Sequence, residues 1–161
     1  MRAMFIATET TAHLLGPAAI DPIALFLPMG AVAARAGFPS PAEDFQDDAL
    51  DLNGLLVKNA PATFLYRAEG WSMLHAGICD GDILVVDRSV TPRDGDLVIA
   101  TWDGNQPTCK VLKVCADHLE LHSRNPHFQP IVLAPGTEAE VFAVVSVARQ
   151  IQRGRQRVRS G

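Results

Sequence analysis

Short runs of apolar and β-branched residues alternate with polar turns from residue 61 onward. The runs cover 63–67, 83–86, 96–102, 108–114, 118–122, 131–133 and 141–151. Several of them are separated by pairs that favour tight turns, namely Asp80-Gly81, Asp94-Gly95 and Asp103-Gly104. No long amphipathic helix interrupts this series. The pattern predicts a mainly β fold, in which residues 61–151 form a curled antiparallel domain.

Residues 1–36 are moderately apolar and lack this alternation. Pro17, Pro22 and Pro28 interrupt their apolar runs, and we expect a flexible arm that docks on the chain itself or on a partner. The end of the arm, Ala34-Arg35-Ala36, resembles a signal-peptide cleavage site, but Arg2 is the only basic residue before it. No uninterrupted apolar run in this arm reaches the length of about 18 residues that a membrane-spanning helix needs. We therefore expect neither secretion nor a membrane contact.

Residues 37–60 are interpreted as a linker that ends in a short apolar segment. The linker opens with Gly-Phe-Pro-Ser-Pro at 37–41, which favours an extended chain. Its acidic residues show no metal-ligand spacing and are expected to be solvated: Glu43, Asp44, Asp47, Asp48 and Asp51. Residues 152–161 form an arginine-rich tail, which we expect to be disordered. This tail could contact DNA weakly or bind an acidic face of a partner.

The composition of the chain limits the size of its folded domain and indicates the redox compartment that it suits. The chain has 161 residues, of which 48% are apolar, and its formal net charge is -4. This suits one acidic domain with a buried core and gives no reason to expect a general nucleic-acid binder. Cys79, Cys109 and Cys115 are odd in number and lack C-x-x-C spacing. They favour free thiols in a reducing cytoplasm.

Ser72 is the candidate nucleophile. It follows the predicted strand 63–67, and Gly70 breaks that strand so that a tight turn can lift the serine to the rim of a sheet. A serine hydroxyl is a poor nucleophile at neutral pH and needs a base within hydrogen-bond reach. Gly70-Trp71-Ser72-Met73 could otherwise be an ordinary turn into a short helix.

Lys110 is the candidate base. Only three lysines occur in the chain, and two of them, Lys110 and Lys113, lie in the predicted strand 108–114. Period-two alternation places them on opposite faces, and Lys110 shares its face with Leu112 and Val114. Apolar surroundings disfavour a charged amine, and a neutral amine can take a proton from a serine. We expect Lys110 to face the interior and Lys113 to face water, although a surface role for both is the ordinary alternative.

The sequence offers two alternative sites, one beside Ser72 and one elsewhere in the predicted β domain. His75 could serve Ser72 as a base, but no carboxylate is placed to orient it. A second set, Cys115, His118, His122 and His127, could suggest zinc, although a structural role fits these side chains better. We expect no metal and no cofactor.

The order of the motifs is similar to that of the LexA/UmuD family of self-cleaving SOS-response proteins. The resemblance covers residues 30 to 150 and rests on an Ala-Gly bond, Phe-Pro-Ser-Pro, Gly-x-Ser-Met and a downstream strand lysine. The segments that look most like UmuD are 36–41, 51–53, 70–73 and 94–100. An arm of 36 residues with three prolines is too short for the winged helix of LexA-type repressors, so the UmuD branch is expected.

The resemblance implies a LexA C-terminal fold with a Ser-Lys peptidase site. Ser72 would attack the Ala36 carbonyl, Lys110 would remove its proton, and the 1–36 arm would leave at the Ala36-Gly37 bond. Backbone N–H groups of Trp71 and Ser72 would form the oxyanion hole. The implied partners are a second copy in a homodimer, a RecA filament on single-stranded DNA that stimulates cleavage, and the catalytic subunit of an error-prone translesion polymerase.

Three departures from the family pattern occur in the sequence. Ala34 stands where a larger apolar residue is usual, the 103–107 turn is one residue longer, and the arginine-rich tail extends past the usual end. Other functions stay open: a binding module that scaffolds a polymerase without cleaving itself, or another LexA-like SOS regulator. A signal peptidase would also use serine and lysine but would need a membrane anchor.

Overall fold

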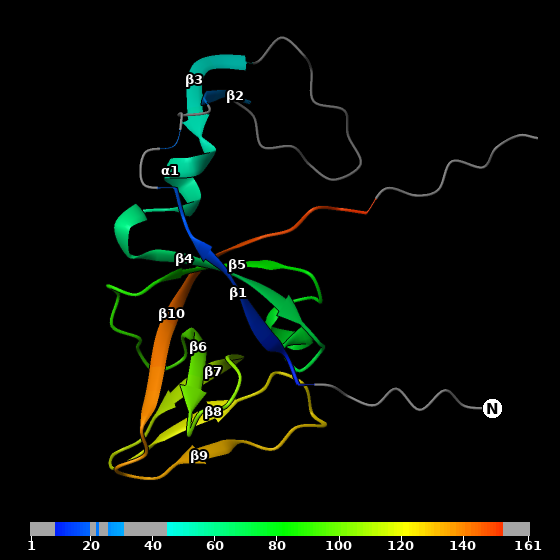
Figure 1. The fold of residues 1–161 in the computed structure, drawn as a ribbon. Coiled ribbons are helices and arrows are strands. Elements are labelled where there is room, and N and C mark those ends of the chain that lie inside the picture. The colour runs from blue at the N-terminus through cyan, green and yellow to red at the C-terminus, as the bar shows by residue number, and fades with distance from the viewer. Residues whose placement is uncertain (1–8, 20–21, 23–25, 31–44, 153–161) are drawn as a thin grey trace, which may run out of the picture.

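A computed structural model describes residues 9–19, 22, 26–30 and 45–152. Eight strands form one antiparallel sheet in the order β1-β4-β5-β10-β6-β7-β8-β9 (Figure 1). Their bounds are β1 (Thr11–Pro17), β4 (Thr63–Glu69), β5 (Ile83–Asp87), β6 (Leu97–Trp102), β7 (Thr108–Val114), β8 (Leu119–His122), β9 (Ile131–Leu133) and β10 (Ala139–Ala148). The mainly β prediction is confirmed.

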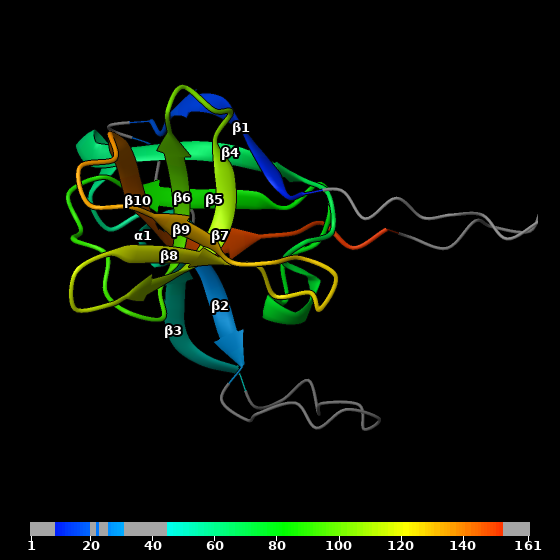
Figure 2. The same cartoon turned by 90° about the horizontal axis from the view of Figure 1, so that it is seen from below.

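The strand β1 closes this sheet into a barrel. It pairs with β4 along most of its length, and Thr11 also pairs with Thr108 of β7. The strands β1, β4, β5, β10, β6 and β7 thereby form a ring around a common interior, while β8 and β9 continue the sheet beyond β7 (Figure 2). Part of the expected arm is therefore a strand of the main sheet.

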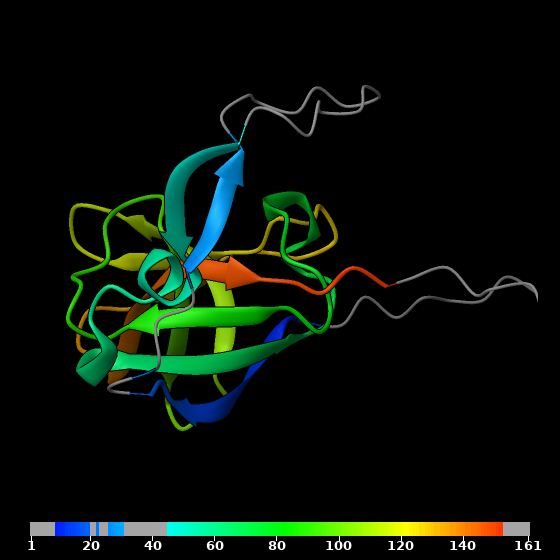
Figure 3. The same ribbon diagram turned by 90° about the horizontal axis from the view of Figure 1, so that it is seen from above.

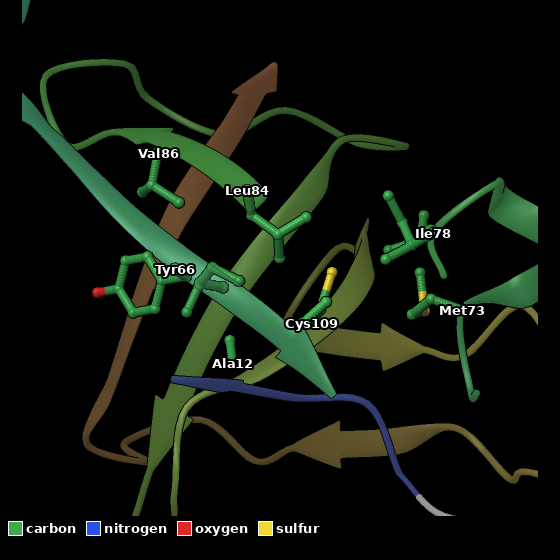
Figure 4. Packing of buried hydrophobic residues seen from close by; sticks show 10 residues of the cluster. Ala12, Tyr66, Met73, Ile78, Leu84, Val86 and Cys109 are labelled. Carbon is green, nitrogen blue, oxygen red and sulfur yellow. The ribbon is translucent and has the colours of Figure 1, made fainter. Parts of the chain in front are cut away.

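Two apolar clusters fill the domain. The larger one joins Ala12 of β1 to Tyr66, Leu84 and Cys109 of the neighbouring strands, and Met73 and Ile78 close one end of it (Figure 4). The second cluster lies under β6, β7 and β8 and includes Val98, Leu112 and Leu121. Both faces of β7 are buried in its first five residues, because this strand separates the two clusters. Burial of each such side chain contributes about 1.5–3 kcal/mol.

A second sheet stands apart from the barrel. It is a hairpin of β2 (Phe26–Gly30) and β3 (Phe45–Asp51), which projects from the barrel in Figures 1 and 3. The helix α1 (Leu52–Leu56) follows, and Asp51 caps it by accepting hydrogen bonds from the backbone N–H groups of Asn53 and Gly54. Two 3-10 turns, η1 (Ala60–Ala62) and η2 (Leu74–Ala76), complete the described elements.

None of the helices in the described part of the chain is long and apolar enough to cross a membrane. The expected cleavage bond between Ala36 and Gly37 and the basic tail from residue 153 lie outside the described residues.

Candidate active site

Ser72 lies on a turn between β4 and η2, and three contacts of residues in this turn hold it in place. Gly70 takes a φ of 103°, a left-handed conformation that favours glycine, and its N–H donates to Asp80 Oδ1 at 2.9 Å. Met73 is buried in the larger cluster. The Ser72 carbonyl accepts a hydrogen bond from the Arg124 N–H at 2.9 Å. These contacts leave the Ser72 side chain with a fixed direction toward β7.

Lys110 extends from β7 toward that serine. Its Nζ lies 3.5 Å from Ser72 Oγ and 2.8 Å from Ser123 Oγ, just beyond the end of β8. Both Lys110 and Ser72 have 0% exposed surface, whereas Lys113 is exposed. The strand alternation therefore gives the correct direction for each lysine. Ser123 was not considered in the sequence, where nothing distinguishes it from other loop serines.

Two residues of the N-terminal segment cover this pair. The Thr10 N–H donates to Ser72 Oγ at 2.8 Å, and the Thr10 carbonyl accepts from the Cys109 N–H at 3.0 Å. The Glu9 carboxylate forms an ion pair with Lys110 Nζ. Sequence reasoning missed both contacts. Glu9 and Thr10 reach the site through the long-range pairing of β1 with β4 and β7, which no local pattern predicts.

Lys110 Nζ has three oxygen partners. Glu9, Ser123 and Ser72 supply one oxygen each. The Glu9 carboxylate occupies one side of Nζ as an ion-pair partner. The Ser72 oxygen also accepts the Thr10 N–H, which uses part of its electron density. In this covered form, the N-terminal segment occupies both Ser72 and Lys110.

The remaining sequence candidates near Ser72 have different surroundings. Among the described residues, neither the Trp71 N–H nor the Ser72 N–H donates a hydrogen bond to another backbone group. His75 is exposed, and the contacts of Ser72 Oγ in the described part of the chain are with Thr10 and Lys110. Burial raises the pKa of Cys109 to about 12, which keeps this neighbour of Lys110 a thiol.

An ion pair stabilises the loop that follows the serine. Arg149 donates to both carboxylate oxygens of buried Asp82 at 2.6 Å and to the Gly77 carbonyl at 2.6 Å. The hydrogen bond from Arg149 lowers the pKa of Asp82 below its usual value. The pair therefore stabilises the fold above the unfolded pKa of an aspartate, about 4. This stabilisation is lost as the pH falls through the lower, folded pKa.

The residues considered for zinc are only partly brought together. Cys115 and His118 lie close to Glu120, an acid that the sequence reasoning did not include. His122 contacts the same carboxylate, and His127 is an exposed residue of the following loop.

Comparison with known proteins identifies the family. The Peptidase S24-like family matches residues 28–146. The chain is 43% identical over 104 residues to Protein ImpA of Salmonella typhimurium, which covers 65% of this chain and 72% of that protein. It is 38% identical over 126 residues to Protein SamA of Salmonella typhimurium strain LT2, with coverages of 78% and 86%.

A repressor belongs to the same set of relatives. The LexA repressor of Acidothermus cellulolyticus is 38% identical over 140 residues, which cover 84% of this chain and 48% of the repressor. The resemblance that the motifs indicated is thereby confirmed. The chain is a UmuD-like member of the LexA/UmuD family of self-cleaving SOS-response proteins, within the Peptidase S24-like family.

Proposed function

We propose that the chain cuts its own Ala36-Gly37 bond, with Ser72 as nucleophile and Lys110 as general base. The observation that carries this proposal is the contact of Lys110 Nζ with Ser72 Oγ at 3.5 Å, between two fully buried polar side chains in a chain of this family. Burial of a lysine amine costs free energy, and such buried, closely placed ionisable groups are typical of catalytic sites, where nucleophile and base must be in contact.

The reaction proceeds through an acyl-enzyme. The neutral amine of Lys110 takes the Ser72 proton while Oγ bonds to the Ala36 carbonyl carbon, and the N–H groups of Trp71 and Ser72 stabilise the oxyanion. Collapse of this intermediate breaks the Ala36-Gly37 bond, and Lys110 returns the proton to the Gly37 amine. Water then releases residues 1–36 from Ser72. Ser123 holds the amine in line through its contact at 2.8 Å.

Glu9 and Thr10 inhibit this reaction. They occupy the serine and the lysine in the covered form, so the scissile segment and Glu9-Thr10 compete for the same site. Release of this segment frees the serine oxygen and removes the carboxylate from Lys110. Slow self-cleavage at neutral pH follows from the need for both events.

Replacement of Glu9 by glutamine is expected to accelerate self-cleavage about fivefold at neutral pH. Loss of one ion pair at a partly exposed site is worth about 1 kcal/mol, and fivefold is that energy expressed as a rate. The measurement is the first-order rate of disappearance of the full-length chain. Glu138→Gln, a change at an exposed acid remote from Lys110, should leave the rate unchanged. Slower cleavage by Glu9→Gln would mean that Glu9 assists the reaction.

The shortened product is proposed to be a homodimeric accessory subunit of an error-prone translesion polymerase in the SOS response. Its relatives Protein ImpA and Protein SamA, together with the LexA repressor, support an SOS context. Loss of residues 1–36 would remove β1 and β2 and free the edges of β4 and β7 for a partner. A RecA filament on single-stranded DNA is the proposed stimulus, since it could displace the covering segment.

Binding to the polymerase should depend on cleavage. Self-cleaved wild-type protein, returned to neutral pH, is expected to bind the catalytic subunit of an error-prone polymerase at least about tenfold more tightly than full-length Ser72→Ala. Light scattering should give the mass of two chains for both forms. Equal affinity of the two forms would assign the accessory role to the uncut chain and would reject cleavage as its switch.

A further inference from the structure

A second cluster of reactive side chains lies on the hairpin that joins β7 to β8, outside the serine and lysine site. The Cys115 N–H donates to the His118 carbonyl at 2.9 Å, so these two residues face each other across the turn at 116–117. His118 directly precedes β8, and Glu120 and His122 lie on it at alternate positions, so the side chains of all three point to the same side. Leu121 between them is fully buried on the other face. The hairpin lies at the side of the barrel marked by β7 and β8 in Figure 2.

The donor atoms of this cluster converge. Cys115 Sγ, a ring nitrogen of His118 and a carboxylate oxygen of Glu120 all lie within 4.8 Å of one another. His118 Nε2 is 3.1 Å from Glu120 Oε1, and His122 Nε2 is 2.6 Å from Glu120 Oε2. The side chains of His118, Glu120 and His122 are between 22% and 26% exposed. The site is open enough to admit an ion and sheltered enough to hold its ligands in place.

These atoms form a donor set for a transition metal. Thiolate sulfur, imidazole nitrogen and carboxylate oxygen are the ligands that Zn²⁺ binds, at about 2.0–2.3 Å. Two ligands of a tetrahedral ion at such distances lie about 3.3–3.8 Å apart. The separation of His118 Nε2 and Glu120 Oε1, 3.1 Å, is close to that spacing, and Cys115 Sγ lies within 4.8 Å of the ligand atoms of both residues.

We propose that Cys115, His118 and Glu120 bind one divalent transition metal of the zinc class. His122 is hydrogen-bonded to the second carboxylate oxygen of Glu120, and Asp117 Oδ1 is hydrogen-bonded to His118 Nδ1 at 2.7 Å. Each of these two residues therefore orients one metal ligand through an atom that does not bind the metal. The Cys115 thiol loses its proton to solvent when the metal binds. A water molecule fills the fourth position.

The charges around the cluster suit a cation. Glu120 and Asp117 are acidic, and the thiolate adds a third negative charge. Lys113 of β7 pairs with Glu120 across the sheet but is exposed, and its flexible amine can turn toward water when an ion is present. The metal would fix the end of the β7–β8 hairpin. Ser123, which contacts Lys110, follows His122 directly in the chain.

Cobalt titration of the full-length, metal-free protein tests this proposal. We expect one equivalent of Co²⁺ to produce a thiolate-to-cobalt absorption band together with the visible bands of a tetrahedral ion, and Zn²⁺ to displace it. Cys115→Ser should abolish the thiolate band. His118→Gln and Glu120→Gln should weaken binding at least about tenfold, the usual cost of a lost ligand or ligand support.

Matched controls decide the outcome. Cys79→Ser removes a half-buried thiol elsewhere, and His127→Gln removes an exposed imidazole, so both should retain wild-type binding. A thiolate band that survives Cys115→Ser, or its absence from the wild-type protein, would overturn the proposal and leave His118 and Glu120 as an ion pair. If Cys115→Ser does not fold, His118→Gln carries the test. Neither result bears on self-cleavage by Ser72.

Discussion

Replacement of Lys110 by methionine is expected to slow self-cleavage by about a thousandfold. General-base catalysis contributes about 10²–10⁴ to the rate of a reaction, and no other base contacts Ser72 Oγ in the described part of the chain. Methionine fills a similar volume in the buried site and supplies no amine. The rate is measured from the loss of full-length protein, under alkaline conditions where the wild-type chain is cut fastest.

The matched control lies three residues along the same strand. Lys113→Met removes an amine of the same length from the exposed face of β7 and should leave the rate within about twofold of wild type. Circular dichroism and chemical unfolding of Lys110→Met separate a lost base from a lost fold. A folded Lys110→Met protein that keeps more than about a tenth of the wild-type rate would exclude lysine as the base.

Self-cleavage is expected to accelerate steeply between about pH 7 and about pH 10. In the range where most of the amine is protonated, each pH unit raises the neutral fraction about tenfold, and the rate should follow it. Glu9 is ion-paired with Lys110 in the covered form, so its removal should change the rate as well. The measurement is a rate profile for wild type beside Glu9→Gln and Ser72→Ala.

The profiles should differ in a defined way. Glu9→Gln should exceed wild type at neutral pH and converge with it at high pH. Ser72→Ala should remain uncut at every pH. A wild-type rate that stays flat over the range would argue against a titrating amine in the rate-limiting step. If the rates of wild type and Glu9→Gln converged at low pH instead, inhibition by Glu9 would be contradicted.

Local sequence patterns predicted the features that depend on neighbouring residues. The alternation at 108–114 correctly turned Lys110 inward, since successive side chains of a strand point to opposite faces. The Asp-Gly pairs correctly marked turns between strands. The same alternation could not predict that both faces of β7 would be buried, because that burial depends on β1 closing the barrel.

Long-range pairing accounts for what the sequence did not reveal. Thr10 and Glu9 reach the site only because β1 pairs with β4 and β7, and no local pattern specifies that register. Ser123 and Glu120 were missed for a similar reason, since each is singled out only by its contact with a residue on another strand or across a turn. The inward direction of Lys110 followed from local rules, whereas its contact with Ser72 and the residues that cover both side chains did not.

The most direct test of the account is the intact mass of purified protein after incubation at about pH 10, and after incubation with activated RecA filament at neutral pH. The account predicts loss of residues 1–36 in both conditions, through the Ala36-Gly37 bond, with Ser72→Ala and Lys110→Ala remaining whole. Full-length wild type under both conditions, or a cut that persists in Ser72→Ala, would contradict self-cleavage by this serine and lysine.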